Sequence, residues 1–167
     1  MRTAIACALS AVILASPAFA QTKTPIPPGE EEVDPYTISD ANAGANPVGG
    51  QDLFVAFHGH EGIGRIVDDL VERVQADPRL TEIFKASDFV RLRRTLKEQF
   101  CYILNGGCSY TGRDMKSAHA NHGVTTAEFN ALVEVLQTAM TREGVAFSAQ
   151  NRLLAKLAPM KRDTVTR

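Results

Sequence analysis

Apolar residues spaced three and four positions apart run from about residue 52 to residue 162, and this spacing limits the fold more than any other feature. The longest stripe consists of Ile63, Ile66, Val67, Leu70, Val71 and Val74, with charged residues between them. This spacing places the apolar side chains on one face of a helix, whereas a strand would need strict alternation. No alternating run of useful length occurs in the sequence, which therefore predicts an all-α fold.

Start and stop signals divide the pattern into separate helices. The first helix ends before Pro78, because proline disfavours a helical conformation in the residue before it. A second stripe comprises Leu92, Leu96, Phe100 and Ile103. It ends at residues 105–107, Asn-Gly-Gly, which accept a left-handed conformation. A third helix begins at Thr125, with Glu128 completing a capping box, and a fourth begins near Ser148. We expect about four substantial helices joined by short ones.

Residues 1–20 are typical of a secretory signal peptide. Arg2 precedes an apolar run over residues 4–15, and small residues stand at Ala18 and Ala20, so cleavage is expected after Ala20. The run is too short to span a membrane. We therefore expect an exported protein, periplasmic or secreted, with no membrane span.

Residues 21–50 are rich in Pro, Gly, Asp, Asn and Thr and contain very few large apolar side chains. Such a segment cannot bury enough surface to offset the conformational entropy lost on ordering it. We expect a disordered or extended lead here, followed by one globular domain over residues 51–163 and a short tail over residues 164–167.

The charge balance and the cysteines limit the expected partners and the expected cellular compartment of the protein. Lys and Arg number 18 against 19 Asp and Glu, and there is no basic arm, so nucleic acid is not an expected partner. Cys7 lies in the leader, which leaves Cys101 and Cys108 in a compartment that permits disulfides. We expect a disulfide across a helix end. The alternative is a buried thiol at Cys101 and a free one at Cys108.

Two histidines stand in a segment that offers little of its own to a core. Residues 106–124 contain several glycines and few large apolar side chains, and they include His119 and His122. A poorly packed stretch inside a helical domain favours a ligand that fills the gap. Neutral imidazole is a good ligand for iron, copper or zinc. From the residues alone, a solvated or core imidazole remains the alternative at both positions.

Three blocks of the sequence resemble the group I truncated haemoglobins. They are IVDDLVERVQADPRLTEIF (residues 66–84), GGCSYTGRDMKSAHANHGV (residues 106–124) and EFNALVEVL (residues 128–136). The resemblance covers nearly the whole domain and keeps the spacing between the blocks. It implies a truncated globin fold, a two-over-two helical sandwich around a b-type haem.

The resemblance also implies the residues of the site. The Met-Lys-x-x-His pattern places the proximal iron ligand at His119, one helical turn after Met115, and leaves His122 solvated. The implied haem contacts are Val71, Phe84, Leu92, Leu96, Phe100, Tyr110, Met115, His119, Val124, Phe129 and Leu132. Arg91 and Arg94 are candidate partners for the haem propionates, with a solvated flank as the alternative.

The sequence departs from the family where dioxygen would be held. The distal tyrosine position of the family is Val71, and the distal glutamine position is Leu96. A donor in a dry pocket typically contributes about one to a few kcal/mol to holding dioxygen, which becomes partly negative when bound. Faster release of dioxygen and faster oxidation are expected. Gln99 is a candidate replacement donor, and a surface glutamine is its alternative role.

These observations predict a haem protein that binds diatomic ligands (O2, NO or CO), with an electron donor that keeps the iron ferrous. Turnover of nitric oxide, as a dioxygenase, or of peroxide is a second expectation for the same site. A periplasmic haem carrier and a cofactor-free helical interaction module are the alternatives. A monomer or weak dimer is expected.

Overall fold

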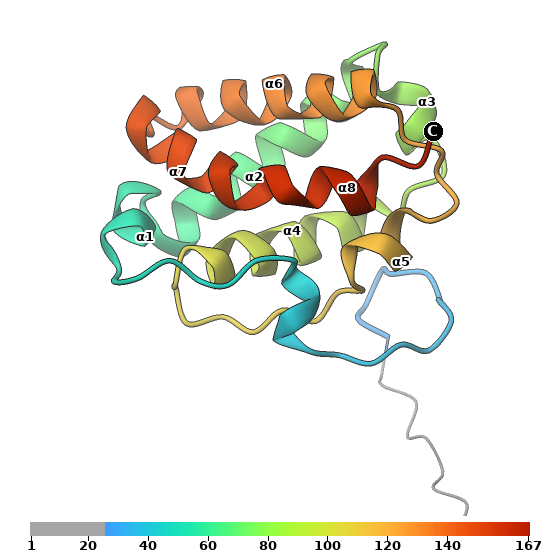
Figure 1. Cartoon of the computed structure of the whole chain (residues 1–167), viewed down its shortest axis with the longest axis horizontal. Coiled ribbons are helices and arrows are strands. Elements are labelled where there is room, and N and C mark those ends of the chain that lie inside the picture. Colours follow the sequence, from blue (N-terminus) through green and yellow to red (C-terminus); the bar gives the residue numbers. More distant parts are fainter. Residues whose placement is uncertain (1–25) are drawn as a thin grey trace, which may run out of the picture.

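The computed structural model describes residues 26–167, and these residues form helices joined by loops, with no strand among them (Figure 1). The helices are α1 (Asp52–Ala56), α2 (Gly59–Ala76), α3 (Thr81–Phe84), α4 (Phe89–Ile103), α5 (Met115–His119), α6 (Thr126–Arg142), α7 (Phe147–Leu157) and α8 (Lys161–Thr164), with 3-10 turns η1 (Asp40–Ala43) and η2 (Ala158–Met160). The all-α prediction is confirmed. The expected signal peptide lies outside the described residues.

The helix boundaries follow the local signals in the sequence. α2 ends at Ala76, and its cap residue Asp77 directly precedes Pro78. α4 starts after Asp88, whose side chain accepts hydrogen bonds from the first free backbone N–H groups of the helix. Asn105 follows α4 with a φ of 62°, the left-handed conformation expected there. Thr125 and Glu128 form the predicted capping box of α6.

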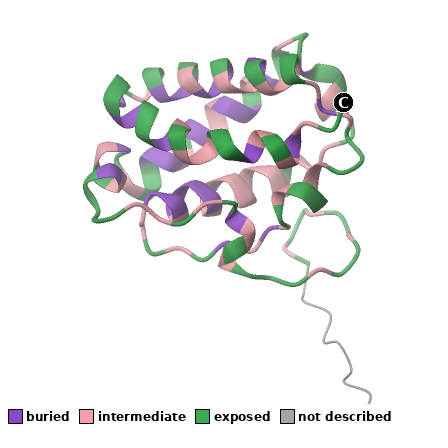
Figure 2. Cartoon of the chain, viewed as in Figure 1, coloured by how far each residue is buried: buried purple, intermediate pink, exposed green. Residues whose placement is uncertain are grey.

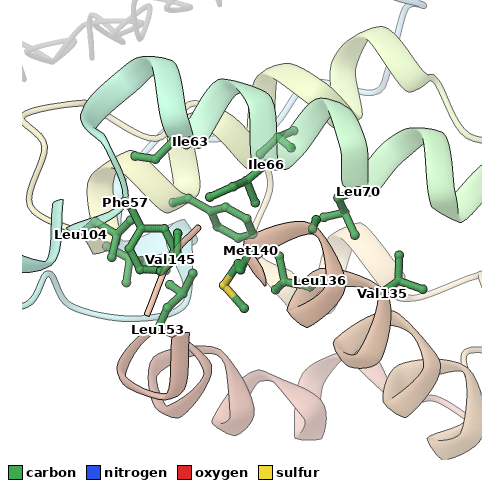
Figure 3. Close-up of a cluster of buried hydrophobic side chains, with 14 of the residues drawn as sticks. Phe57, Ile63, Ile66, Leu70, Leu104, Val135, Leu136, Met140, Val145 and Leu153 are labelled. Atoms are coloured by element: carbon green, nitrogen blue, oxygen red, sulfur yellow. The ribbon is translucent and has the colours of Figure 1, made fainter. Parts of the chain in front are cut away.

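The four long helices form two pairs, one stacked on the other. α2 packs along α4, α6 packs on α7, and α2 also contacts α6 (Figure 1). Their inward faces are buried (Figure 2), and Figure 3 shows where side chains such as Phe57, Leu70 and Leu153 meet across the pairs. Burial of this apolar surface is the main force that holds the pairs together. The expected two-over-two arrangement is confirmed.

Residues 26–50 belong to the segment expected to form a disordered or extended lead. The segment is mostly extended, but it packs along α4 and the loop before α5 (Figure 1). Glu30 forms ion pairs with Arg91 and Arg94, and its side chain is only 1% exposed. Tyr36 donates a hydrogen bond to the carbonyl of Thr111. The segment therefore belongs to the domain, held by polar contacts that its composition does not reveal.

Residues 164–167, expected to form a short tail, also make contacts with the domain. Thr164 is buried at the end of α8, and the backbone N–H groups of Thr166 and Arg167 donate to the carbonyl of Val124. The folded domain thus extends to the last residues of the chain.

Cys101 and Cys108 form the expected disulfide. It joins the last turn of α4 to the loop that leads to α5. Closing a loop of this length stabilises the folded chain by about 2.5 kcal/mol in the chain-entropy account. No helix within the described part is long and apolar enough to cross a membrane.

A charged cluster at the start of α2 should make stability depend on pH. Glu143 accepts hydrogen bonds from Arg65 and from the ring of His58, and its side chain is 13% exposed. Chiefly because of the Arg65 hydrogen bond, the pKa of Glu143 falls to about 2 from its usual value of 4.5. Its contribution is therefore fully present above pH 4.5 and is lost as the pH falls towards 2.

We expect Glu143→Gln to lower the thermal midpoint at pH 6, and the difference from the unmodified protein to shrink between pH 4.5 and pH 2. Thermal unfolding followed by circular dichroism measures this. Glu134→Gln is the matched control, because the Glu134 side chain is 61% exposed where it pairs with Arg79. A midpoint difference that is the same at pH 6 and pH 2 would contradict the assignment.

Candidate functional site

The short helix α5 fixes the ring of His119. Asp114 caps the helix, accepting a hydrogen bond from the Ser117 backbone N–H at 3.0 Å. One turn on, His119 Nδ1 lies 2.7 Å from the carbonyl oxygen of Met115. Because a carbonyl can only accept, Nδ1 must carry the proton. The other ring nitrogen, Nε2, is left with a free lone pair, as in a metal-ligating histidine.

Burial keeps His119 neutral. Burial lowers the pKa of this imidazole below its usual 6.5, and the nearby ring of His122 acts in the same direction. The hydrogen bond to Met115 opposes the shift without cancelling it. At neutral pH the lone pair of Nε2 is therefore not blocked by a proton.

A cavity of about 200 Å³ opens beside His119. Its walls come from α3, α4, α5 and α6, with Thr164 of α8 at its edge. A dry engineered cavity of about 150 Å³ holds benzene, so this space accepts part of a flat ring system. α4 is half-buried, not buried, over residues 91–98, where it borders this space (Figure 2).

Most of the residues that the sequence implied meet at this cavity. Those that line it are Phe84, Leu92, Leu96, Tyr110, Met115, His119, Val124, Phe129 and Leu132. Val71 and Phe100 do not line it and lie buried in the main core, 0% and 2% exposed. Val71 belongs to α2, which does not line the cavity, and Phe100 belongs to α4; both side chains pack between helices.

Gln99 differs from both roles considered for it. It is 5% exposed and borders the cavity, so it is not a surface residue. Its Nε2 donates to the carbonyl of Ala43 at 2.8 Å, and the sulfur atoms of Met115 and Met160 lie at 3.6 and 3.7 Å. The amide thus binds residues 26–50 and is not a free donor for a ligand.

Two hydroxyl groups of the cavity wall, those of Tyr110 and Thr95, are also engaged within the protein. Tyr110 donates to the carbonyl of Arg113 at 3.1 Å, and burial raises the pKa of its phenol to about 12. Thr95 donates to the carbonyl of Arg91 within its own helix. These two hydroxyls therefore have their protons committed elsewhere.

His122 lies at the margin of the cavity. It is exposed, as expected, yet it is one of the lining residues. Its ring centroid is 6.4 Å from that of His119, at an interplanar angle of 65°. His119 is the better buried of the two, and only its ring is held by a backbone carbonyl among the contacts found.

Several lining residues were missed by sequence reasoning: Leu80, Ile83, Ser87, Thr95, Ala118, Glu128 and Thr164. A signal existed for two of them. Leu80 and Ile83 precede Phe84 by four residues and one, so the turn that carries Phe84 brings them to the same region. Thr164 reaches the cavity only through the packing of α8 on α5, which local sequence does not reveal.

Arg91 and Arg94 were candidate partners for an anionic group, but both bind Glu30. Arg94 also pairs with Glu98.

A second hollow, of about 610 Å³, lies between the end of α2 and α6. It is lined by charged side chains, including Arg79 and Glu134, which pair with each other, and no histidine lines it.

The sequence model of the family described as bacterial-like globin matches residues 52–166. A group 1 truncated haemoglobin of Mycolicibacterium paratuberculosis is 32% identical over 114 residues, which cover 68% of this chain and 84% of that protein. The chain belongs to the group 1 truncated haemoglobins. A further member, from Nostoc commune, is 29% identical over 65% of this chain and 92% of its own length.

Solved structures of truncated haemoglobins show the same fold. The Fe(III) form of the Tetrahymena pyriformis protein has a TM-score of 0.65 and 21% identity, covering 69% of this chain and 98% of that one. The 2/2 haemoglobin of Synechococcus, described in the cyanomet state with covalently attached haem, has a TM-score of 0.63 and 22% identity, with the same coverage. Membership of the globins implies that this truncated haemoglobin binds haem and, through it, diatomic gases.

The residues of the cavity fit a haem. His119 offers a neutral nitrogen whose lone pair is free, and the tautomer is set by Met115. Apolar side chains such as Leu92, Leu96 and Phe129 make up much of the wall, and these suit a porphyrin ring. The fit rests on the donor and on the chemistry of the lining.

Proposed function

We propose that this truncated haemoglobin is an exported protein that binds a diatomic gas at haem b, whose iron would be held by His119 Nε2. The hydrogen bond from His119 Nδ1 to Met115 supports this most directly, because it fixes the tautomer and ring orientation that an iron ligand needs. When bound, the haem supplies an iron centre for ligand binding and electron transfer. The chain supplies the ligand, the apolar walls and the exclusion of water.

The character of the gas site follows from α4. Leu92 and Leu96 face the cavity without a polar atom, and the nearby amide of Gln99 is occupied by Ala43. Dioxygen depends on a hydrogen-bond donor more than carbon monoxide or nitric oxide does. We therefore infer that O2 is retained weakly, whereas the binding of NO and CO depends less on the side chains of the cavity wall. An electron donor is needed to keep the iron reduced.

Absorption spectra of the haem-loaded protein in its ferric, ferrous and CO forms test this function. A Soret band in the ferric form that shifts on reduction and again with CO is the expected result. Colourless protein after purification with haem available would instead support an interaction module. Rapid loss of the band to an apoglobin acceptor would support a haem carrier, and both results would overturn the proposal.

Catalysis by the same site is separable from binding. Rapid mixing of the oxygenated protein with nitric oxide gives the rate of its oxidation. We expect modest turnover, because the amide of Gln99 and the hydroxyls of Tyr110 and Thr95 are engaged within the protein and cannot orient dioxygen. A rate equal to that of free haem would eliminate a nitric oxide dioxygenase role.

Export is part of the proposal. The basic start, short apolar run and small residues of the leader favour it, as does a disulfide, which persists in oxidising compartments. Fractionation of cells that express the full chain should find the shortened protein outside the cytoplasm. Recovery of unshortened protein in the cytoplasm alone would contradict it.

A further inference from the structure

We propose that reduction of the disulfide creates a zinc site formed by Cys101, Cys108 and His60. The site lies at the opposite end of α4 from Asp88 and contains none of the residues that line the haem cavity. Two thiolates and an imidazole are a ligand set that suits a thiophilic divalent ion such as Zn²⁺. The inference does not depend on whether the haem binds as proposed.

The spacing of the three donors carries the argument. His60 Nδ1 lies 3.5 Å from Cys101 Sγ and 3.7 Å from Cys108 Sγ. In a tetrahedral zinc site with the usual Zn–S and Zn–N bond lengths, nitrogen and sulfur ligands stand about 3.6 Å apart. The imidazole is thus already at ligand distance from both sulfur atoms, and all three donor atoms lie within 4.8 Å of one another.

The neighbouring residues hold the donors in place. His60 belongs to the first turn of α2, and its ring meets the edge of Phe54 with centroids 4.9 Å apart. At Gly106, an added Cβ would lie 2.4 Å from the Phe54 ring and 2.8 Å from Cys101 Sγ. Only a glycine allows this close approach. Two segments distant in sequence, residues 54–60 and residues 101–108, are therefore packed tightly around the cluster.

Exposure favours a site with one open position. Cys101 is buried, Cys108 is half-buried and His60 is exposed. A zinc ion held by the three donors would face solvent on the His60 side, where water can complete the four-coordinate shell. A metal ion from solvent can therefore reach the three donor atoms while the hydrophobic core stays closed.

The chemistry balances with a dithiol reductant. The reductant gives two electrons and two protons to the disulfide, the S–S bond breaks, two thiols form, and the reductant closes to its own disulfide. Zn²⁺ then displaces one proton from each thiol and binds two thiolates and the neutral imidazole. Two protons are released and no further electron moves.

Zinc retention by the haem-loaded protein tests the proposal. The protein is reduced with a dithiol, freed of reductant by gel filtration under argon, and mixed with Zn²⁺ alone. We expect one retained zinc ion per reduced chain and none per oxidised chain, measured by atomic absorption after a second gel filtration. Competition with a chromophoric chelator gives the affinity, and zinc content is measured independently of the haem spectrum.

His60→Ala keeps both cysteines and isolates the imidazole. We expect it to weaken zinc binding by the reduced chain at least about tenfold. The matched control is His58→Asn, which removes a neighbouring histidine outside the cluster with a residue that tolerates its φ of 59°. Both reduced variants lack the disulfide equally, and circular dichroism checks their helix content. Zinc retained by the oxidised chain, no zinc on the reduced chain, or unchanged affinity in His60→Ala would overturn the site.

Discussion

Replacing His119 by alanine should abolish the Soret band of protein purified with haem available. The change removes the one ring nitrogen that the cavity presents with its tautomer fixed, at Met115. Loss of a residue that merely orients a metal ligand costs about 10- to 100-fold in affinity, so loss of the ligand itself should cost at least 100-fold. Haem titration into the apoprotein, followed by absorbance, measures the change.

Two comparisons make this result specific. His122→Ala removes an imidazole from the margin of the same cavity and should leave haem affinity within about threefold, since its exposed ring is replaceable by water. Added imidazole should restore the band to His119→Ala, because the free base can enter the space that the side chain left. If His122→Ala loses the haem and His119→Ala keeps it, the assignment of the axial ligand is wrong.

Leu96→Gln should slow the release of dioxygen by about tenfold or more. Leu96 lines the cavity from α4, where the nearby donors Thr95 and Gln99 are engaged within the protein. An amide there would donate to the partly negative ligand, and such hydrogen bonds contribute about 1 to 3 kcal/mol in a dry site. Oxidation of the oxygenated protein in air should slow in parallel.

The ligand and the side chain each supply a control for this change. Flash photolysis with CO should show release rates that change less than about threefold, because CO gains little from the donor. Leu96→Met keeps the volume of the side chain and adds no donor, so its O2 release should stay close to that of the unmodified protein. Equal slowing in Leu96→Met would show that packing, and not hydrogen bonding, sets the rate.

The helices were predictable because their signals are local. The stripes of α2 and α4, the proline after Asp77 and the capping box at Thr125 each act within one or two turns of chain. His119 could also be placed from sequence, through its spacing from Met115 and the resemblance to a known family. Each of these features involves residues close together in the sequence, so a sequence pattern can predict it.

Contacts between distant residues escaped the sequence. Residues 26–50 contain few large apolar side chains and so resembled a free lead, yet Glu30 reaches Arg91 and Arg94 across some 60 residues. Gln99 looked like a surface or ligand-binding residue because its partner, the carbonyl of Ala43, carries no side-chain signal. Such contacts form between segments far apart in the sequence, and which segments meet is fixed only when the helices pack together.

Helical spacing alone also did not predict whether an individual apolar side chain faces the cavity or the core. Phe100 lies in a stripe whose members Leu92 and Leu96 line the cavity, but its own side chain is buried in the core. No member of the stripe that contains Val71 lines the cavity. Both side chains turn out to fill the core between α2 and the helices around it. Removing Val71 should therefore cost folding stability before it alters gas binding.

The disulfide between the end of α4 and the loop before α5 affects the conformational freedom of the chain before it binds haem. The disulfide limits how far the loop before α5 can move from the end of α4 before any porphyrin binds, so less conformational freedom is lost on haem binding than in a chain without it. A globin matured where thiols oxidise would then capture scarce haem more readily than the same chain kept reduced in a cell interior.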